Sequence, residues 1–180
     1  SERMRFNREE IKDEQLLNIL NDCVLDVEKY QLSYYELLFL CFLKFTMRKE
    51  KVDIILLEVG LGGRLDAVNL LDADYAGITS ISRDHQELLG YQLKDILNEK
   101  LGIIRKDQFL VSCLEQTSLR SQIELKIENL NINHKDLFTL GTVKLEDHYK
   151  QRNYQVAKTI FEQLSTCVIP KISNISPSKG

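Results

Sequence analysis

Apolar residues in the first quarter of the chain recur at helical spacing. Residues 13–31 carry apolar side chains at positions 16, 17, 20, 24 and 27, which predicts a helical segment with one apolar face. The stretch YELLFLCFLKF that follows is apolar on all sides and leads into the basic run RKEK. This pattern predicts a buried helix over residues 34–48. The helix would be too short to span a bilayer, and it carries Lys44.

Three continuous apolar runs come next, and each predicts a strand. They are VDIILLEV at residues 52–59, ADYAGITSIS at 73–82 and QFLVSCL at 108–114. Unbroken apolar runs of this length are typical of strands covered on both faces, as in a parallel sheet. Between the second and third runs, YQLKDILNEKLGII has helical spacing, with Gly102 as its expected C-cap. Strand, helix and strand in this order predict a right-handed crossover unit.

The remaining third of the chain has weaker patterns. We expect a helix in SLRSQIELKIENL, short strands or a loop in NINHKDLFTLGTVKLED, and a final helix at residues 149–165. Together, the elements predict an α/β fold of three layers, with a mainly parallel sheet flanked by helices.

Composition narrows the class of protein. The chain has 180 residues, of which 43% are hydrophobic, enough for one domain with a sizeable core. Its net charge of −3 gives no reason to expect binding to nucleic acid or to an anionic membrane. Its four cysteines form no C-x-x-C pair, which indicates reduced thiols in a cytosolic protein and not a zinc site. The charged N-terminus has no signal-peptide pattern, so we expect a soluble, cytoplasmic protein.

Chemically interesting residues follow two of the predicted strands. Glu58 ends the first and leads into a turn with glycines at 60, 62 and 63, while SISRDH at the end of the second supplies Asp84 and His85. Ligands bind beyond the carboxyl ends of parallel strands, where glycines expose N–H groups to anions and a carboxylate suits a divalent cation beside phosphate. The same residues have simpler explanations: Glu58 as the first solvated residue after a buried strand, and His85 as a turn residue.

Other catalytic and nucleotide-binding patterns are weak or missing. GLGGRL has Leu65 where a dinucleotide fingerprint needs its third glycine, and no G-x-x-x-x-G-K-[ST] phosphate loop occurs. No Ser-His-Asp or Cys-His pattern indicates a covalent nucleophile.

Residues 52–107 resemble the central ATPase domain of folylpolyglutamate synthase and dihydrofolate synthase, a branch of the Mur ligase superfamily. The motifs that carry this resemblance are LEVGLGGRLDA-N, ITSI--DH---LG and EK-GI-, in that order and spacing. Weaker matches are SERMRFNREEI, with Asn7 where glycine is usual, LSYYELLFLCF and QRNYQVA. Nearly the whole chain is therefore covered.

The resemblance implies a metal site. Glu58 and His85 fall on the family's magnesium ligands, although histidine is an unusual ligand for so hard a cation. Lys100 falls on the lysine that the family carbamylates, a modification that turns an amine into an oxygen ligand for a second magnesium. On the pattern alone, Lys100 is a solvated helix residue.

The resemblance also implies substrate contacts. ATP would be recognised at its adenine edge by Asn153, with Gln151 beside it. The residues that fall on the pterin-binding segments are Ser33, Tyr34, Tyr35, Glu36, Arg64, Leu65 and Asp66. On the residues alone, the two tyrosines also fit an ordinary core and Asn153 an exposed helix position.

The family's organisation sets expectations for the domains. Residues 1–169 would form a partial Mur-ligase-type ATPase domain that lacks its N-terminal phosphate-loop segment. Residues 170–180 would be a linker toward an absent C-terminal glutamate-ligase domain. We expect such a fragment to be inactive alone and to expose a sheet edge that can pair with another copy, whereas the intact enzyme would be a monomer.

The implied function is an amide ligase of folate metabolism that uses ATP and Mg2+, with a monovalent cation as a further candidate. ATP would phosphorylate a carboxylate of dihydropteroate or of a reduced, (poly)glutamylated folate, and the amino group of L-glutamate would attack the acyl phosphate. Two alternatives stay open: another Mur-type ligase that acts on a cell-wall precursor, and a short non-catalytic paralogue that binds folate or a partner.

Overall fold

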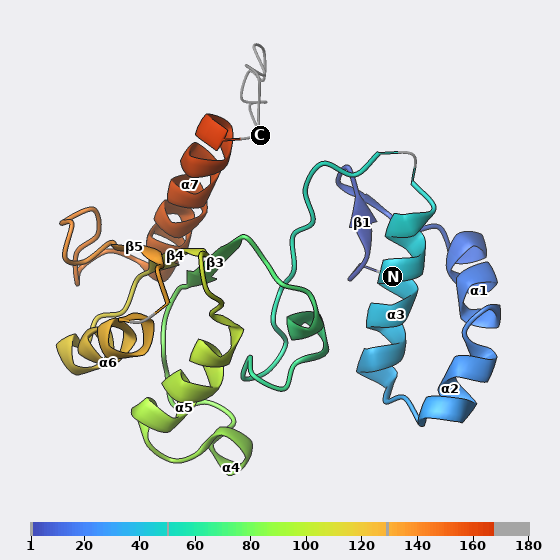
Figure 1. Ribbon diagram of the computed structural model, residues 1–180, viewed down its shortest axis with the longest axis horizontal. Helices are drawn as coiled ribbons and strands as arrows, with labels where there is room; N and C mark the ends of the chain where they lie inside the picture. Colours follow the sequence, from blue (N-terminus) through green and yellow to red (C-terminus); the bar gives the residue numbers. More distant parts are fainter. Residues whose placement is uncertain (1, 50, 129, 168–180) are drawn as a thin grey trace. The chain divides into compact units, whose positions relative to one another are not determined.

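The computed structural model describes residues 2–49, 51–128 and 130–167, and it divides into two compact units (Figure 1). The first unit runs to Val59 and also includes Asp66–Leu70. The second unit consists of Gly60–Leu65 and the chain from Leu71 onward. The expected linker at residues 170–180 lies outside the described residues. None of the helices in the described ranges has the length and apolar character that a membrane span needs.

The first unit begins with a short antiparallel hairpin. Strand β1 (Arg5–Phe6) pairs with β2 (Glu9–Glu10), and the two linking residues, Asn7 and Arg8, have φ angles of 51° and 72°. Two successive positive φ angles suit a tight hairpin turn, and asparagine tolerates this conformation better than most residues. Asn7 therefore keeps the backbone conformation that glycine would favour at this position.

Helices supply most of the first unit. The segment expected to be helical at 13–31 is two helices, α1 (Asp13–Asn21) and α2 (Val24–Tyr30). Ile19 and Cys23 are buried, whereas Leu17 and Val24, expected on the apolar face, are at least half exposed. The break between the helices shifts the spacing of buried positions, so the single predicted face is wrong.

The predicted buried helix is confirmed as α3 (Tyr34–Met47), and a short 3-10 turn, η1 (Ala67–Leu70), completes the unit. Helices α1 and α3 and the hairpin region enclose one apolar core. Its buried residues are Met4, Ile11, Ile19, Cys23, Leu38, Cys41 and Phe45.

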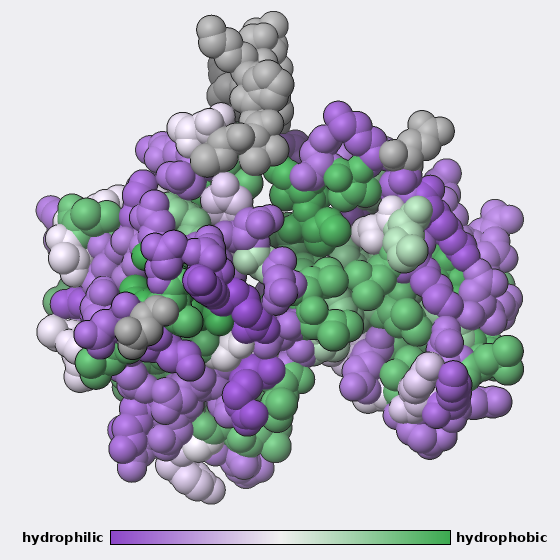
Figure 2. Space-filling view, viewed as in Figure 1, coloured by the Kyte–Doolittle hydropathy of each residue, from purple (hydrophilic) through white to green (hydrophobic). Residues whose placement is uncertain are grey.

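The strand predicted at residues 52–59 is wrong. The chain there is irregular, and Ile54, Ile55 and Leu56 are 50%, 44% and 91% exposed. Figure 2 shows hydrophobic side chains on the molecular surface among polar ones. A strand needs a neighbour that accepts and donates its ladder hydrogen bonds, and the β1–β2 hairpin is the first unit's one sheet among the described residues. Glu58 consequently does not follow a strand.

The second unit contains a three-stranded parallel sheet, in agreement with the predicted mainly parallel sheet, and its third strand comes from the segment expected to be short strands or a loop. Its strands are β3 (Tyr75–Ile78), β4 (Phe109–Ser112) and β5 (Asn133–Asp136), in the order β3-β4-β5. Tyr75 pairs with Phe109, and Phe109 pairs in turn with Asn133. All four residues of the central strand β4 are buried.

Helices cover both faces of this sheet. Helices α5 (Leu93–Lys100) and α6 (Thr117–Ile127) pack on one face, against Leu110 and its neighbours. Helix α7 (Tyr149–Cys167) packs on the other face (Figure 1), where Val156 and Val111 belong to one apolar core. The unit also contains the short helix α4 (Gln86–Leu89) and the 3-10 turn η2 (Leu101–Ile103). The α/β fold with three layers is therefore confirmed.

Candidate functional site

The N-terminus of α3 carries four of the residues expected to bind substrate. Ser33 and Glu36 form a capping box: Ser33 Oγ accepts a hydrogen bond from the Glu36 N–H at 3.3 Å, and the Glu36 carboxylate accepts one from the Ser33 N–H at 2.8 Å. The hydrogen bonds from the Ser33 side chain and backbone hold the pKa of Glu36 below its ordinary value. Both side chains therefore start the helix, whatever else they contact.

The two tyrosines that follow behave differently from each other. Tyr34 is 73% exposed, so it is no core residue and its ring is accessible to a ligand. Tyr35 is half-buried, and its hydroxyl donates a hydrogen bond to the backbone carbonyl of Glu58 at 3.5 Å. The first unit thus brings the start of α3 together with the exposed Glu58, two sites that are 23 residues apart in sequence.

Asp66 has a local structural role in the first unit. Its Oδ1 accepts a hydrogen bond from the Val68 N–H at 3.0 Å, and its carbonyl accepts one from the Asn69 N–H at 3.0 Å. An Asx turn of this kind starts the 3-10 turn η1. The position expected to contact pterin is therefore fixed by its own backbone contacts.

The glycine-rich turn of the second unit lies against the end of α5. The Arg64 N–H donates to the Glu99 carbonyl at 2.8 Å, and the Arg64 guanidinium binds Glu99 Oε1 through Nε at 3.1 Å and Nη2 at 3.0 Å. Gly62 and Gly63 both have positive φ angles, 66° and 155°. Leu65, which follows Arg64, is 79% exposed.

Two glycines allow this close approach. A Cβ on Gly63 would lie 2.9 Å from the Glu99 carbonyl oxygen, and one on Gly102 would lie 2.3 Å from the Arg64 Cβ. Gly102 lies inside η2 and has no positive φ, so its prediction as a helix C-cap is wrong. At these two positions, the missing side chains make room for the chain's own loop.

The expected metal ligands of the second unit are Lys100 and His85. Lys100 is half-buried in the last turn of α5, so it is not a fully solvated residue. His85 is exposed, has a φ of 49° and directly precedes α4, and its N–H donates to Asp84 Oδ1 at 2.8 Å. The turn explanation for His85 is thus confirmed for its backbone, while its ring remains accessible.

Clusters of metal-binding side chains give no sign of a metal site in the described part of the chain. Residues 2–49, 51–128 and 130–167 contain no group of three or more His, Cys, Asp and Glu side chains that could hold a metal ion. The expected donors are a carboxylate, an imidazole and a carbamate oxygen, all of which bind divalent cations. Glu58, in the first unit, and His85, in the second, are each exposed, so a ligand can reach either side chain.

The expected adenine contacts lie near the start of α7. Asn153 and Gln151 are both exposed, and the Gln151 N–H bonds the His148 carbonyl at 2.9 Å, within the first turn. The simpler explanation of Asn153 as an exposed helix position fits this placement, and an exposed amide is also able to reach a nucleotide.

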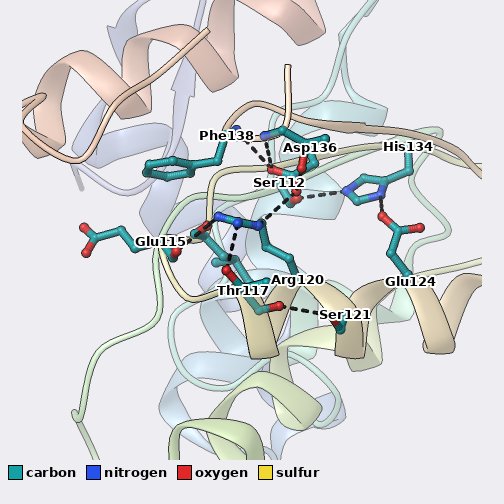
Figure 3. Close-up of polar contacts among 11 residues, drawn as sticks. Ser112, Glu115, Thr117, Arg120, Ser121, Glu124, His134, Asp136 and Phe138 are labelled. Carbon is teal, nitrogen blue, oxygen red and sulfur yellow. Dashed lines mark hydrogen bonds and ion pairs between the residues drawn. The ribbon is translucent and has the colours of Figure 1, made fainter. Parts of the chain in front are cut away.

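A buried polar network at the end of the sheet escaped the sequence reasoning (Figure 3). Ser112 Oγ lies 2.8 Å from His134 Nε2, and His134 Nδ1 lies 2.9 Å from Glu124 Oε1. Asp136 beside it forms an ion pair with Arg120 at 3.4 Å. The signal available was a polar residue at the end of each of two strands, Ser112 and Asp136. Ser112 is fully buried and the His134 side chain is 6% exposed, whereas the Glu124 side chain is 60% exposed, so the arrangement satisfies the interior polar groups of Ser112 and His134 and does not present a nucleophile.

Comparisons with known proteins agree with the motifs. No family model matches the sequence. The chain is 33% identical over 144 residues to a dihydrofolate synthase/folylpolyglutamate synthase of Buchnera aphidicola subsp. Baizongia pistaciae, covering 76% of the chain and 34% of the relative. It is 33% identical over 174 residues to the Haemophilus influenzae protein of the same name, covering 94% of the chain and 38% of the relative. The chain therefore spans about a third of the length of these relatives.

Solved structures show the same likeness. A bifunctional folylpolyglutamate synthase/dihydrofolate synthase with Mn, AMPPNP and L-glutamate bound matches with a TM-score of 0.63 and 30% identity, over 73% of this chain and 32% of that chain. The Escherichia coli FolC in complex with DHPP and ADP matches with a TM-score of 0.60 and 29% identity, over 73% of this chain and 31% of that chain. The resemblance that the motifs indicated is confirmed.

Proposed function

Since the chain matches one part of the dihydrofolate synthase/folylpolyglutamate synthase family, we propose that it carries part of an ATP-dependent ligase. The ligase would add L-glutamate to dihydropteroate, to (poly)glutamyl folates or to both. The observation that carries this proposal is the match in sequence and fold to a synthase that holds Mn, AMPPNP and L-glutamate. The chain covers about a third of such a protein, so we expect the 180-residue chain alone to be inactive.

The accessible residues of the site suit this chemistry. Glu58, His85 and a carbamylated Lys100 would hold magnesium, which supplies positive charge beside the phosphates of ATP when it is bound. Tyr34 and Leu65 are both exposed and offer apolar contact surface to a pterin. Ser33, Tyr35, Glu36, Arg64 and Asp66 complete the expected pterin contacts, and Asn153 with Gln151 would meet the adenine edge.

The reaction needs no covalent nucleophile from the protein. The substrate carboxylate accepts the γ-phosphoryl group of ATP, and the amino group of glutamate then displaces phosphate to form the amide. The protein's contribution is to position the two carboxylate-bearing substrates and to neutralise charge as the phosphoryl group moves. The same proposal includes a monovalent cation as a further cofactor, a cytoplasmic location and a monomeric intact enzyme.

The test measures glutamate-dependent ADP release by the complete polypeptide that contains this sequence. Dihydropteroate, a reduced folate and a cell-wall precursor peptide serve as alternative acceptors. We expect release with one or both pterins, and we expect Glu58→Ala and His85→Ala each to reduce it at least about a hundredfold, as loss of a charge-stabilising group commonly does. Glu146→Ala, which removes another exposed carboxylate, should have no effect. A folded protein that releases ADP with neither pterin would contradict the proposal.

A further inference from the structure

The glycine-rich turn contacts the end of helix α5 through Arg64 and Glu99. Arg64 and Glu99 share a main-chain hydrogen bond of 2.8 Å and two side-chain hydrogen bonds of 3.1 and 3.0 Å. The Arg64 side chain is 55% exposed and that of Glu99 only 25%. The carboxylate is therefore the more enclosed partner, and the arginine reaches over it from the loop.

The main chains around this pair are in close contact on both sides. A Cβ on Gly63 would lie 3.1 Å from the Lys100 Cα and 3.0 Å from the Ile103 Cγ2. A Cβ on Gly102 would overlap Arg64 itself. These close approaches restrict how the loop can pack against the end of α5. Lys100, next to Glu99 in sequence, lies in the helical turn that the loop contacts.

We infer that Glu99 is a positioning residue: it holds Arg64, and through it the glycine-rich turn, against the helical turn that carries Lys100. This inference rests on the proposed function, in which the turn and Lys100 belong to one site. Arg64 then acts by holding the turn in place, instead of through the direct pterin contact expected for it, and Leu65, which is 79% exposed, is the residue of the turn whose side chain is open to a ligand.

Charge and exposure indicate a local effect and not a global one. An ion pair this exposed contributes little to the overall stability of a protein. Gly62 and Gly63 have no side chains, so the side-chain link from Arg64 to Glu99 ties this part of the loop to α5. Loss of the carboxylate should therefore release the loop while the sheet and its helices stay folded.

The first measurement is amide hydrogen exchange in residues 60–65 of the 180-residue chain, with Glu99→Gln and Glu99→Ala as variants. We expect exchange at the Arg64 amide to be about three- to tenfold faster in both, because one hydrogen bond and its support are weakened. Glu128→Gln is the matched control, since Glu128 is an exposed glutamate at the end of α6. Unchanged exchange in the Glu99 variants would overturn the inference, and this readout does not depend on ligase activity.

The second measurement exchanges the charges. Arg64→Glu combined with Glu99→Arg should restore slow exchange. In the active complete polypeptide, Arg64→Glu alone should raise the KM for the pterin, and the double variant should return it most of the way to the wild-type value. An arginine that contacts the pterin directly would not be replaced by one on α5. Failure of the double variant to recover either property would therefore overturn the positioning role, while wild-type ADP release would remain as evidence for the function itself.

Discussion

Two apolar runs of similar composition have different structures in this protein. QFLVSCL, at residues 108–114, contains β4, and its residues are buried throughout. VDIILLEV, at residues 52–59, forms no strand, and Leu56 in its middle is 91% exposed. Apolar composition alone therefore does not decide whether a run becomes a strand.

The difference lies in the neighbours. Strand β4 has hydrogen-bonded strands on both sides, β3 and β5, and apolar cores on both faces. The first unit builds its core from α1, α3 and residues near the hairpin, without a parallel strand among the described residues. An apolar run indicates that its burial would be favourable. Whether it forms a strand depends on a hydrogen-bonding neighbour strand, which comes from elsewhere in the chain.

The largest effect should come from placing a charge in each run. Leu110→Asp puts a carboxylate into a fully buried position of β4 and should destabilise the second unit by more than about 4 kcal/mol. Leu56→Asp makes the same change at an exposed position and should alter the free energy of unfolding by less than about 0.5 kcal/mol. Urea unfolding followed by circular dichroism compares the two variants. Equal losses would mean that residues 52–59 are buried in solution.

Substitutions of polar residues in the two runs should differ less in their effect on the free energy of unfolding. Ser112→Ala removes the partner of His134 Nε2 in a buried network and should cost about 1–3 kcal/mol. Asp53→Ala breaks an exposed ion pair with Lys51 and should cost at most about 1 kcal/mol. Thermal unfolding of both variants measures the difference. A stable Ser112→Ala protein would show that His134 finds another partner.

The second unit was the more predictable part of the molecule. The runs at 73–82 and 108–114 and the helix between them all formed, because each strand's partner lies within the same stretch of chain. The metal and adenine positions, such as Glu58, are implied by the resemblance to the synthase family, whose motifs give the order of the residues and not their geometry. They stay predictions.

What escaped prediction depends on contacts across long separations. The Arg64–Glu99 pair joins residues 35 apart, and Gly102 is a glycine because Arg64 approaches it, which helical spacing cannot reveal. The buried network of Ser112 and His134 depends on the register of β4 against β5. The capping box at Ser33 and Glu36 was not predicted either, although it is a local S-x-x-E signature that the sequence alone contains.

The smallest effect concerns Cys113, which immediately follows β4 in the buried run. Burial raises the pKa of its thiol from 9.0 to about 11. The thiol of an unfolded chain would ionise near pH 9, whereas the folded one stays neutral, so the stabilisation is complete below pH 9 and is lost as pH rises toward 11. Between pH 8 and 10.5 the free energy of unfolding should fall by about 1–2 kcal/mol more in the wild type than in Cys113→Ala. Cys41 has a pKa raised to about 12 and titrates equally in both proteins, so the difference between them isolates Cys113. Parallel pH profiles would show that the end of this run is open to water, as residues 52–59 are, and the contrast between the two runs would then be confined to the strand itself.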